Sequence, residues 1–88
     1  MRIKDGYMLK KVAGENLLIN TGPASADFSK VIKLNDTAAW MWQQIADGNS
    51  PEETAQLAAE KYSIDIEKAR QDVGGFAAEL VKNGLAEP

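Results

Sequence analysis

The chain has 88 residues, of which 44% are hydrophobic and 26% charged, and a formal net charge of -3, as is typical of one small globular domain. It contains no cysteine and no histidine, which excludes disulfides and removes the commonest general base and metal ligands. We therefore expect no catalysis and no cofactor or metal, and the negative charge argues against a nucleic-acid partner.

From its length we expect the chain to form a single domain over residues 1–88. No segment is apolar enough for a signal peptide or a membrane span, so we expect the domain in the cytoplasm and not bound to a membrane. In "YMLKKVAGENLLIN", short apolar runs flank Gly14-Glu15-Asn16, which predicts an antiparallel hairpin with strands near residues 7–13 and 17–21. The small and polar residues of "TGPASAD" then predict a loop.

The run "FSKVIKL" alternates in hydropathy and predicts a third strand from Phe28 to Leu34, at the edge of the sheet. Its two faces would carry different residues. Phe28, Ile32 and Leu34 fall on one face, and Ser29, Val31 and Lys33 on the other.

The first predicted helix follows in "NDTAAWMWQQIADG", with Asn35 or Asp36 as N-cap and Gly48 just past its end. Helical spacing predicts a core-facing side made of Ala38, Met41, Trp42 and Ile45. Trp40 points away from that side. Two interpretations of Trp40 stay open: packing against a loop or the rim of the sheet, and docking of a partner.

The second predicted helix, in "SPEETAQLAAEKY", has a capping box made by Ser50 and Glu53, with Pro51 in the first helical position. Its predicted inner face consists of Thr54, Ala55, Ala58 and Tyr62. The pair Glu52-Glu53 could be read as catalytic carboxylates, but two acids in the first turn are explained by the helix dipole. We adopt the structural interpretation.

The third predicted helix begins at Asp65 and ends before Gly84, where Leu85 can fold back on Leu80 in a Schellman motif. Its apolar stripe consists of Ile66, Ala69, Val73, Phe76 and Leu80. Two glycines, Gly74 and Gly75, interrupt the helix, although each costs about 1 kcal/mol relative to alanine in a helix interior.

These elements predict an α+β domain that is winged-helix-like, with a three-stranded antiparallel sheet followed by three helices. A winged-helix protein could use the third helix to read DNA. The outward charges of that helix cancel, however, because Glu67, Asp72 and Glu79 balance Lys68, Arg70 and Lys82. No basic stripe results, and DNA binding is the alternative that we favour less.

The stretch from residue 34 to residue 85 resembles the PqqD family. The resemblance rests on an ordered set of helix caps, core residues and a tryptophan: Leu34, Asn35, Ala38, Trp42, Gly48, Ser50, Glu53, Tyr62, Asp72, Val73, Phe76, Leu80, Gly84 and Leu85. With the preceding strands it covers nearly the whole chain. The two adjacent glycines are not part of the family pattern.

The resemblance implies a peptide-binding module, called a RiPP recognition element, that acts as a peptide chaperone. Such proteins bind the leader segment of a ribosomally made precursor peptide and present it to a modifying enzyme, often a radical S-adenosylmethionine (SAM) enzyme, as in peptide natural-product or PQQ biosynthesis. The leader adds as a strand beside the third strand and lies against the third helix. A docking subunit of another complex is a further alternative.

Mapped on this chain, the resemblance implies a peptide-binding strand over residues 30–34: Lys30, Val31, Ile32, Lys33 and Leu34. The two lysines would attract acidic leader residues, or would only protect an exposed strand edge from aggregation. On the third helix we expect the groove wall at Val73 and the flank of Arg70, Gly74, Ala77 and Val81.

The missing side chains of Gly74 and Gly75 suggest that a peptide or partner approaches the helix backbone there, although a merely tolerated flexible helix is an equal alternative. An open strand edge also leaves the choice between a monomer and a weak dimer open.

Overall fold

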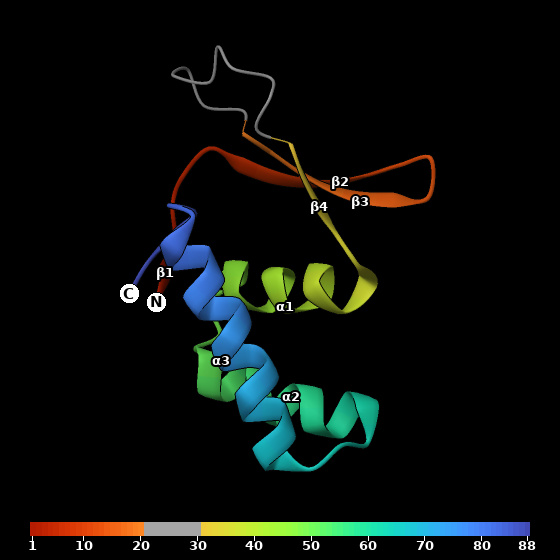
Figure 1. Cartoon of the computed structure of the whole chain (residues 1–88), viewed down its shortest axis with the longest axis vertical. Coiled ribbons are helices and arrows are strands. Elements are labelled where there is room, and N and C mark those ends of the chain that lie inside the picture. Colours follow the sequence, from red (N-terminus) through yellow and green to blue (C-terminus); the bar gives the residue numbers. More distant parts are fainter. Residues whose placement is uncertain (21–30) are drawn as a thin grey trace.

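A computed structural model describes residues 1–20 and 31–88 of the chain (Figure 1). The expected α+β fold is confirmed, with a three-stranded antiparallel sheet followed by three helices in the described residues. The elements are β1 (Arg2–Ile3), β2 (Tyr7–Val12), β3 (Glu15–Asn20), β4 (Ile32–Leu34), α1 (Asp36–Ala46), α2 (Pro51–Tyr62), α3 (Ile66–Lys82) and β5 (Ala86–Glu87).

The hairpin of β2 and β3 turns at Ala13 and Gly14, earlier than the sequence suggested. Both residues have positive φ angles, 52° and 80°, and Val12 pairs with Glu15 directly across the turn. A two-residue turn with positive φ at both positions is type I′, whose twist matches that of the strands it joins. Because the turn is so short, Glu15 and Asn16 belong to β3 and not to the turn.

β4 is the edge strand that the sequence predicted. The sheet order is β2-β3-β4, and β4 pairs antiparallel with β3 so that Leu18 lies opposite Ile32 and Asn16 opposite Leu34. The described strand is shorter than expected and begins at Ile32, just after Val31. The first part of the predicted strand, residues 28–30, lies outside the described residues.

The two ends of the chain form a second, small sheet that the sequence did not predict. β1 and β5 pair antiparallel, with Ile3 opposite Ala86, and the backbone N–H of Lys4 donates to the carbonyl of Leu85 at 3.0 Å. The two ends therefore lie side by side (Figure 1). Strands of two residues have too little periodicity to be recognised from sequence.

The expected helix caps are present. The Asn35 side chain accepts a hydrogen bond from the Ala38 backbone at 2.7 Å, and Ser50 and Glu53 form the complete capping box. After α3, Gly84 has a φ of +74°, and the Leu85 N–H donates to the Leu80 carbonyl at 2.8 Å, as in a Schellman motif. These caps fix where each helix begins and ends, and they position the segments between the helices.

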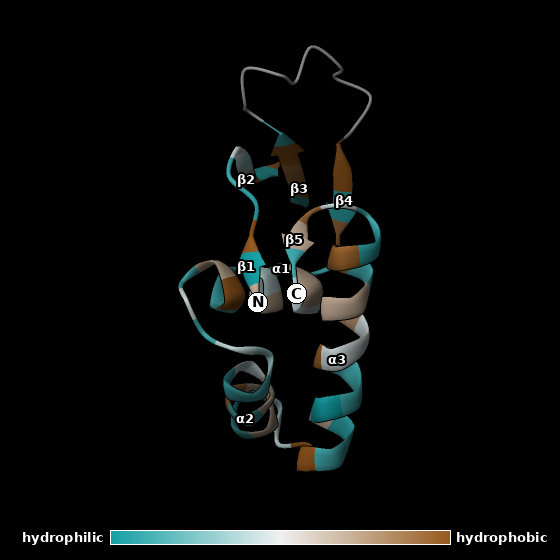
Figure 2. Cartoon of the chain, turned by 90° about the vertical axis from the view of Figure 1, so that its left-hand side faces the viewer, coloured by the Kyte–Doolittle hydropathy of each residue, from teal (hydrophilic) through white to brown (hydrophobic). Residues whose placement is uncertain are grey.

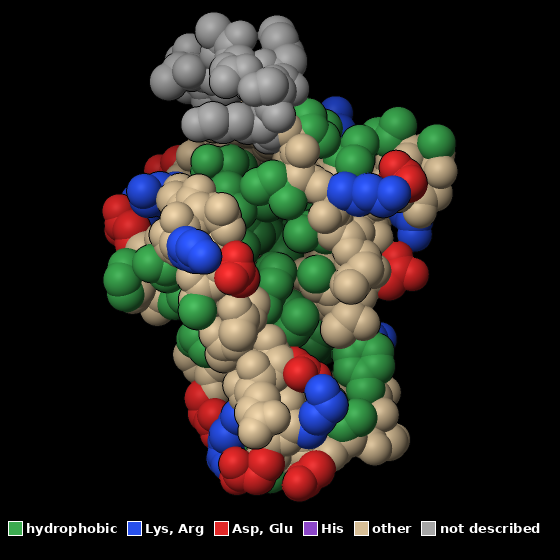
Figure 3. All heavy atoms as spheres, in the orientation of Figure 1, with side chains coloured by type: hydrophobic (Ala, Val, Ile, Leu, Met, Phe, Trp, Pro, Cys, Tyr) green, Lys and Arg blue, Asp and Glu red, His purple; other side chains and the backbone are tan. Residues whose placement is uncertain are grey.

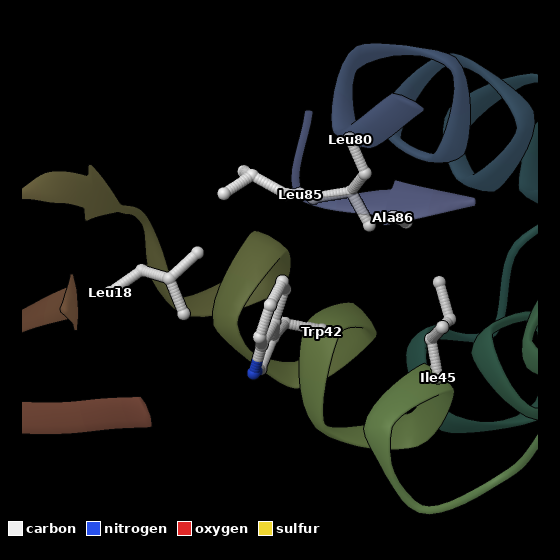
Figure 4. Packing of buried hydrophobic residues seen from close by; sticks show 6 residues of the cluster. All are labelled: Leu18, Trp42, Ile45, Leu80, Leu85 and Ala86. Carbon is white, nitrogen blue, oxygen red and sulfur yellow. The ribbon is translucent and has the colours of Figure 1, made fainter. Parts of the chain in front are cut away.

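Two clusters of buried residues form the core. The sheet-side cluster joins the sheet and the chain ends to α1 and α3 around Trp42 (Figure 4), and consists of Leu18, Trp42, Ile45, Leu80, Leu85 and Ala86. The helical cluster joins α1, α2 and α3, and consists of Met41, Ala55, Ala58, Ala69 and Val73. Phe76 packs against both clusters.

Burial agrees with most of the predicted inner faces, with exceptions at Tyr62 and Ala38. Tyr62 was expected on the inner face of α2 but is 38% exposed, because it lies at the last turn and packs edge-on against Trp40. Ala39, and not Ala38, is among the most buried residues of α1. The described part of the chain holds no helix with the length and hydrophobicity of a membrane span.

Candidate functional site

A hollow of about 300 Å³ lies between β4 and the C-terminal half of α3. Figure 3 shows apolar side chains gathered in the middle of this face of the molecule, with charged side chains to either side. The floor of the hollow is apolar and consists of Ile32, Leu34, Ala38, Phe76, Leu80 and Leu85. Its polar lining consists of Lys33, Asn35, Glu79 and Asn83. An apolar surface with a few polar groups is what a binding site for an organic ligand requires.

The edge strand β4 borders this hollow with an open backbone. One edge of β4 pairs with β3, and the other pairs with no strand among residues 1–20 and 31–88. In Figure 2, β4 points down toward the last turns of α3, whereas Figure 1 separates the two, with α1 running between them; residues of both elements line the hollow. Unpaired N–H and C=O groups at such an edge are a template for another extended chain.

Local structure explains why these residues meet. The Asn35 cap starts α1 immediately after β4, which fixes Leu34 and Ala38 on one side of the hollow. The Schellman motif after α3 turns the chain back, so that Leu85 packs on Leu80 at the opposite side. The hollow is thus formed by β4, the start of α1 and the end of α3.

The charged groups of the hollow differ in their surroundings. The Lys33 ammonium forms an ion pair with Glu15 at 2.6 Å, on the neighbouring strand β3. Glu79 has no cationic partner among the described residues, and the Asn83 amide donates to its backbone carbonyl at 2.8 Å and to its carboxylate at 3.4 Å. Local compensation of Lys33 weakens its attraction for acidic ligands.

Part of the predicted peptide-binding set lies at this hollow. Ile32, Lys33 and Leu34 line it, and Val31, which is 44% exposed, comes just before them. Lys30 lies outside the described residues.

The predicted flank of α3 lies elsewhere. None of Arg70, Val73, Gly74, Ala77 and Val81 lines the hollow. Val73 and Ala77 are buried, and Gly74 is exposed. Arg70 pairs with Glu52 of α2 at 2.8 Å and with Glu67 at 3.0 Å, which turns this flank toward α2.

The wall beside β4 is the other flank of α3, which sequence reasoning missed. Phe76, Glu79, Leu80 and Asn83 follow a spacing of three, one and three residues and lie along one side of the helix. The signal was present, because Phe76 and Leu80 belong to the apolar stripe. Glu79 was counted only as an outward charge, and Asn83 was given no role.

Trp40 lies outside the hollow, at the junction of α1 and α2. It is half-buried, its ring meets that of Tyr62 edge-on with centroids 5.7 Å apart, and the Lys61 ammonium lies 5.9 Å from the Trp40 centroid. Trp40 also packs against the helical cluster, so these contacts are with helices and not with a loop or the rim of the sheet. A docking role for Trp40 stays a prediction.

The remaining charged residues on α3 do not form a basic surface. Lys68 pairs with Asp72 at 3.0 Å, and Arg70 is held by two glutamates. The Arg70 hydrogen bonds also lower the pKa of the Glu52 carboxyl. Within the described ranges, no group of three or more acidic residues is placed to hold a metal ion.

Comparisons with known proteins place this geometry in context. The family model described as "Coenzyme PQQ synthesis protein D (PqqD)" matches residues 10–86. The solved structure "Lasso peptide synthetase B1 complexed with the leader peptide" is 28% identical, with a TM-score of 0.78 over 99% of this chain and 96% of that chain.

A second solved structure, "TbiB1 in Complex with the TbiA(beta) Leader Peptide", is 22% identical, with a TM-score of 0.78 over 99% of this chain and 95% of that chain. At that identity the likeness concerns the fold alone. The search of curated proteins gave no match.

Proposed function

The chain belongs to the PqqD family, and we propose that it binds the leader segment of a ribosomally made precursor peptide by strand addition. The observation that carries this proposal is the open edge of β4 directly beside an apolar hollow. The similar structure named as a lasso peptide synthetase B1 is itself a complex with a leader peptide, which supports the same class of ligand.

In this mechanism the leader extends the sheet order to β2-β3-β4-leader. Its backbone forms hydrogen bonds with the open edge of β4, and these bonds do not depend on the leader's sequence. Alternate leader side chains point to opposite faces, so every second one enters the hollow against Leu34 and Phe76. The backbone thus supplies affinity, and the hollow supplies selectivity.

We propose further that the protein is not an enzyme and presents the bound leader to one, in peptide natural-product or PQQ-type cofactor biosynthesis in the cytoplasm. A radical SAM enzyme is the partner that the family resemblance favours. The disordered leader loses entropy when it binds, so moderate affinity and ready release to the enzyme are expected.

An N-methyl scan of the leader tests strand addition. The ligand is the leader segment of the precursor peptide encoded beside this protein's gene, made as a fluorescent peptide with one backbone amide methylated at a time. In a β-ladder, alternate residues direct their N–H groups to opposite edges. Fluorescence anisotropy should therefore show strong loss of affinity at every second position, with small effects between.

Each methylated position serves as the control for its neighbours, because every variant carries the same added methyl group. A scan in which the losses show no period of two would contradict strand addition. Unchanged affinity at all positions would mean that the leader does not bind through its backbone.

A further inference from the structure

The charge beside the hollow bears on which leaders the protein selects. The residues that line the hollow include two charged ones, Lys33 and Glu79. The family resemblance left two roles open for the lysines of this strand, attraction of an acidic leader and protection of the strand edge from aggregation. Lys33, however, already has a carboxylate partner in Glu15 on β3, at 2.6 Å.

The direction of each side chain separates these two charges further. Residues alternate along β4, so Lys33 lies on the face opposite to Ile32 and Leu34, which are partly buried against the sheet-side core. Glu79 lies on α3, across the hollow from β4. A leader strand added to β4 therefore has Lys33 on the face away from Ile32 and Leu34, and Glu79 across the hollow.

The nearby groups leave the Glu79 charge uncompensated within the described residues. Lys82, one turn further along α3, forms no ion pair with Glu79. The Glu79 carboxylate accepts a hydrogen bond from the Asn83 amide at 3.4 Å. Asp36, at the start of α1, is a second carboxylate near this end of β4, and it accepts a hydrogen bond from Asn16 at 2.8 Å. A carboxylate without a cation at the border of an apolar surface favours a cationic ligand group.

We infer that Glu79 selects leaders that place a lysine or arginine at this border, next to an apolar side chain that enters the hollow against Phe76 and Leu85. This inference rests on the proposed function and names its ligand class. When the leader covers the hollow, water is displaced around Glu79, and the ion pair becomes stronger than an exposed one. The basic leader residue fixes the register, because only one position of the strand brings it to Glu79.

Selection from a displayed library of random short peptides tests this inference without knowledge of the natural leader. The wild-type protein should enrich peptides with lysine or arginine at a fixed spacing from an apolar residue. The Glu79→Lys variant should enrich aspartate or glutamate there instead. Glu60→Lys on α2, on the side of the molecule away from β4 (Figure 1), makes the same change in net charge and should keep the wild-type preference.

An enriched peptide is then resynthesised with a fluorescent label for affinity measurements. Glu79→Gln should weaken its binding about tenfold, as for a hydrogen bond to a charged group, and replacing the basic residue of the peptide should weaken it equally. Amide spectra of each variant confirm that it is folded, and those of the labelled wild-type protein locate the bound peptide.

The two proposals fail in different ways. One result would be that enriched peptides shift the amide resonances of residues 31–34 and yet show the same charge preference with the wild type and with Glu79→Lys. That result would overturn the role of Glu79 and leave strand addition intact. Enrichment of no peptide, or of peptides that shift residues away from β4, would overturn the proposed function and this inference with it.

Discussion

The two halves of α3 have different surroundings. The first half packs against α2 over the helical cluster, and its charged residues are paired, Arg70 with Glu52 and Lys68 with Asp72. The second half packs on the sheet-side cluster and leaves its other side open toward β4. Both halves of this helix therefore contribute to the core, and the second half also supplies one wall of the hollow.

The largest expected effect comes from breaking the sheet-side cluster under the open half. Leu18 on β3 is fully buried, so Leu18→Ala should lower the free energy of unfolding by about 3 kcal/mol, through lost burial and the cavity left behind. Urea denaturation measures this change. Leu57→Ala, at a position 38% exposed on α2, is the control and should cost about 0.5 kcal/mol or less.

Phe76 lies near the middle of α3 and packs against both clusters. Its substitution should lower both the stability of the domain and its affinity for the leader. Phe76→Ala should lower the free energy of unfolding by about 2 kcal/mol, because the ring is only partly buried. It should also weaken leader binding about tenfold, since the ring lines the hollow. Phe76→Leu keeps most of the buried surface and should keep most of the stability. Unchanged leader affinity in folded Phe76→Ala would remove this half of α3 from the site.

Substitution of the adjacent glycines, Gly74 and Gly75, should raise the stability of the domain and not lower it. A Cβ atom added at Gly74 or Gly75 would meet nothing within 4 Å, and neither residue has a positive φ angle. Alanine at either position should therefore raise the free energy of unfolding by about 1 kcal/mol. Thermal denaturation tests this.

The same variants test the hypothesis that a ligand approaches the helix at the glycines. Gly74 does not line the hollow, so Gly74→Ala and Gly74→Leu should leave leader affinity unchanged. Weaker binding by these variants in folded form would mean that the leader or a partner does approach α3 there.

The smallest expected effect concerns the ion pair between Arg70, in the first half of α3, and Glu52 of α2. Hydrogen bonds from Arg70 lower the pKa of Glu52 below its ordinary value of 4.5. The ionised form is favoured by folding, so this stabilisation is fully present above pH 4.5 and is lost as the pH falls through the lower folded pKa. Glu52→Gln and Arg70→Ala should each flatten this part of the stability profile. Urea midpoints measured between neutral and acidic pH give the stability profile of each variant. A loss of stability at acidic pH as large as in the wild type would contradict the assignment of this loss to the Glu52–Arg70 pair.

Local signals predicted most of the elements. Asn35, Ser50 and Gly84 mark helix ends through hydrogen bonds within a few residues of the chain, so their roles can be read without the fold. The third strand was also expected at the edge of the sheet, where β4 lies. These predictions depend on neighbours in sequence, and the structure confirms them.

The features that the sequence did not predict depend on contacts between distant segments. Which flank of α3 faces β4 is decided by how α3 crosses α2, and the Arg70–Glu52 pair, with a separation of 18 residues, has no local signal. The pairing of Ile3 with Ala86 joins opposite ends of the chain. Glu79 was therefore counted as a surface charge, although it lines the hollow.

Amide NMR titration of the labelled protein with the leader of its neighbouring precursor gene tests strand addition most directly. Saturable shifts at Ile32, Lys33 and Leu34, together with Phe76, Glu79 and Asn83, are the predicted result. Shifts absent from β4, or centred on Trp40, would contradict leader binding at this edge.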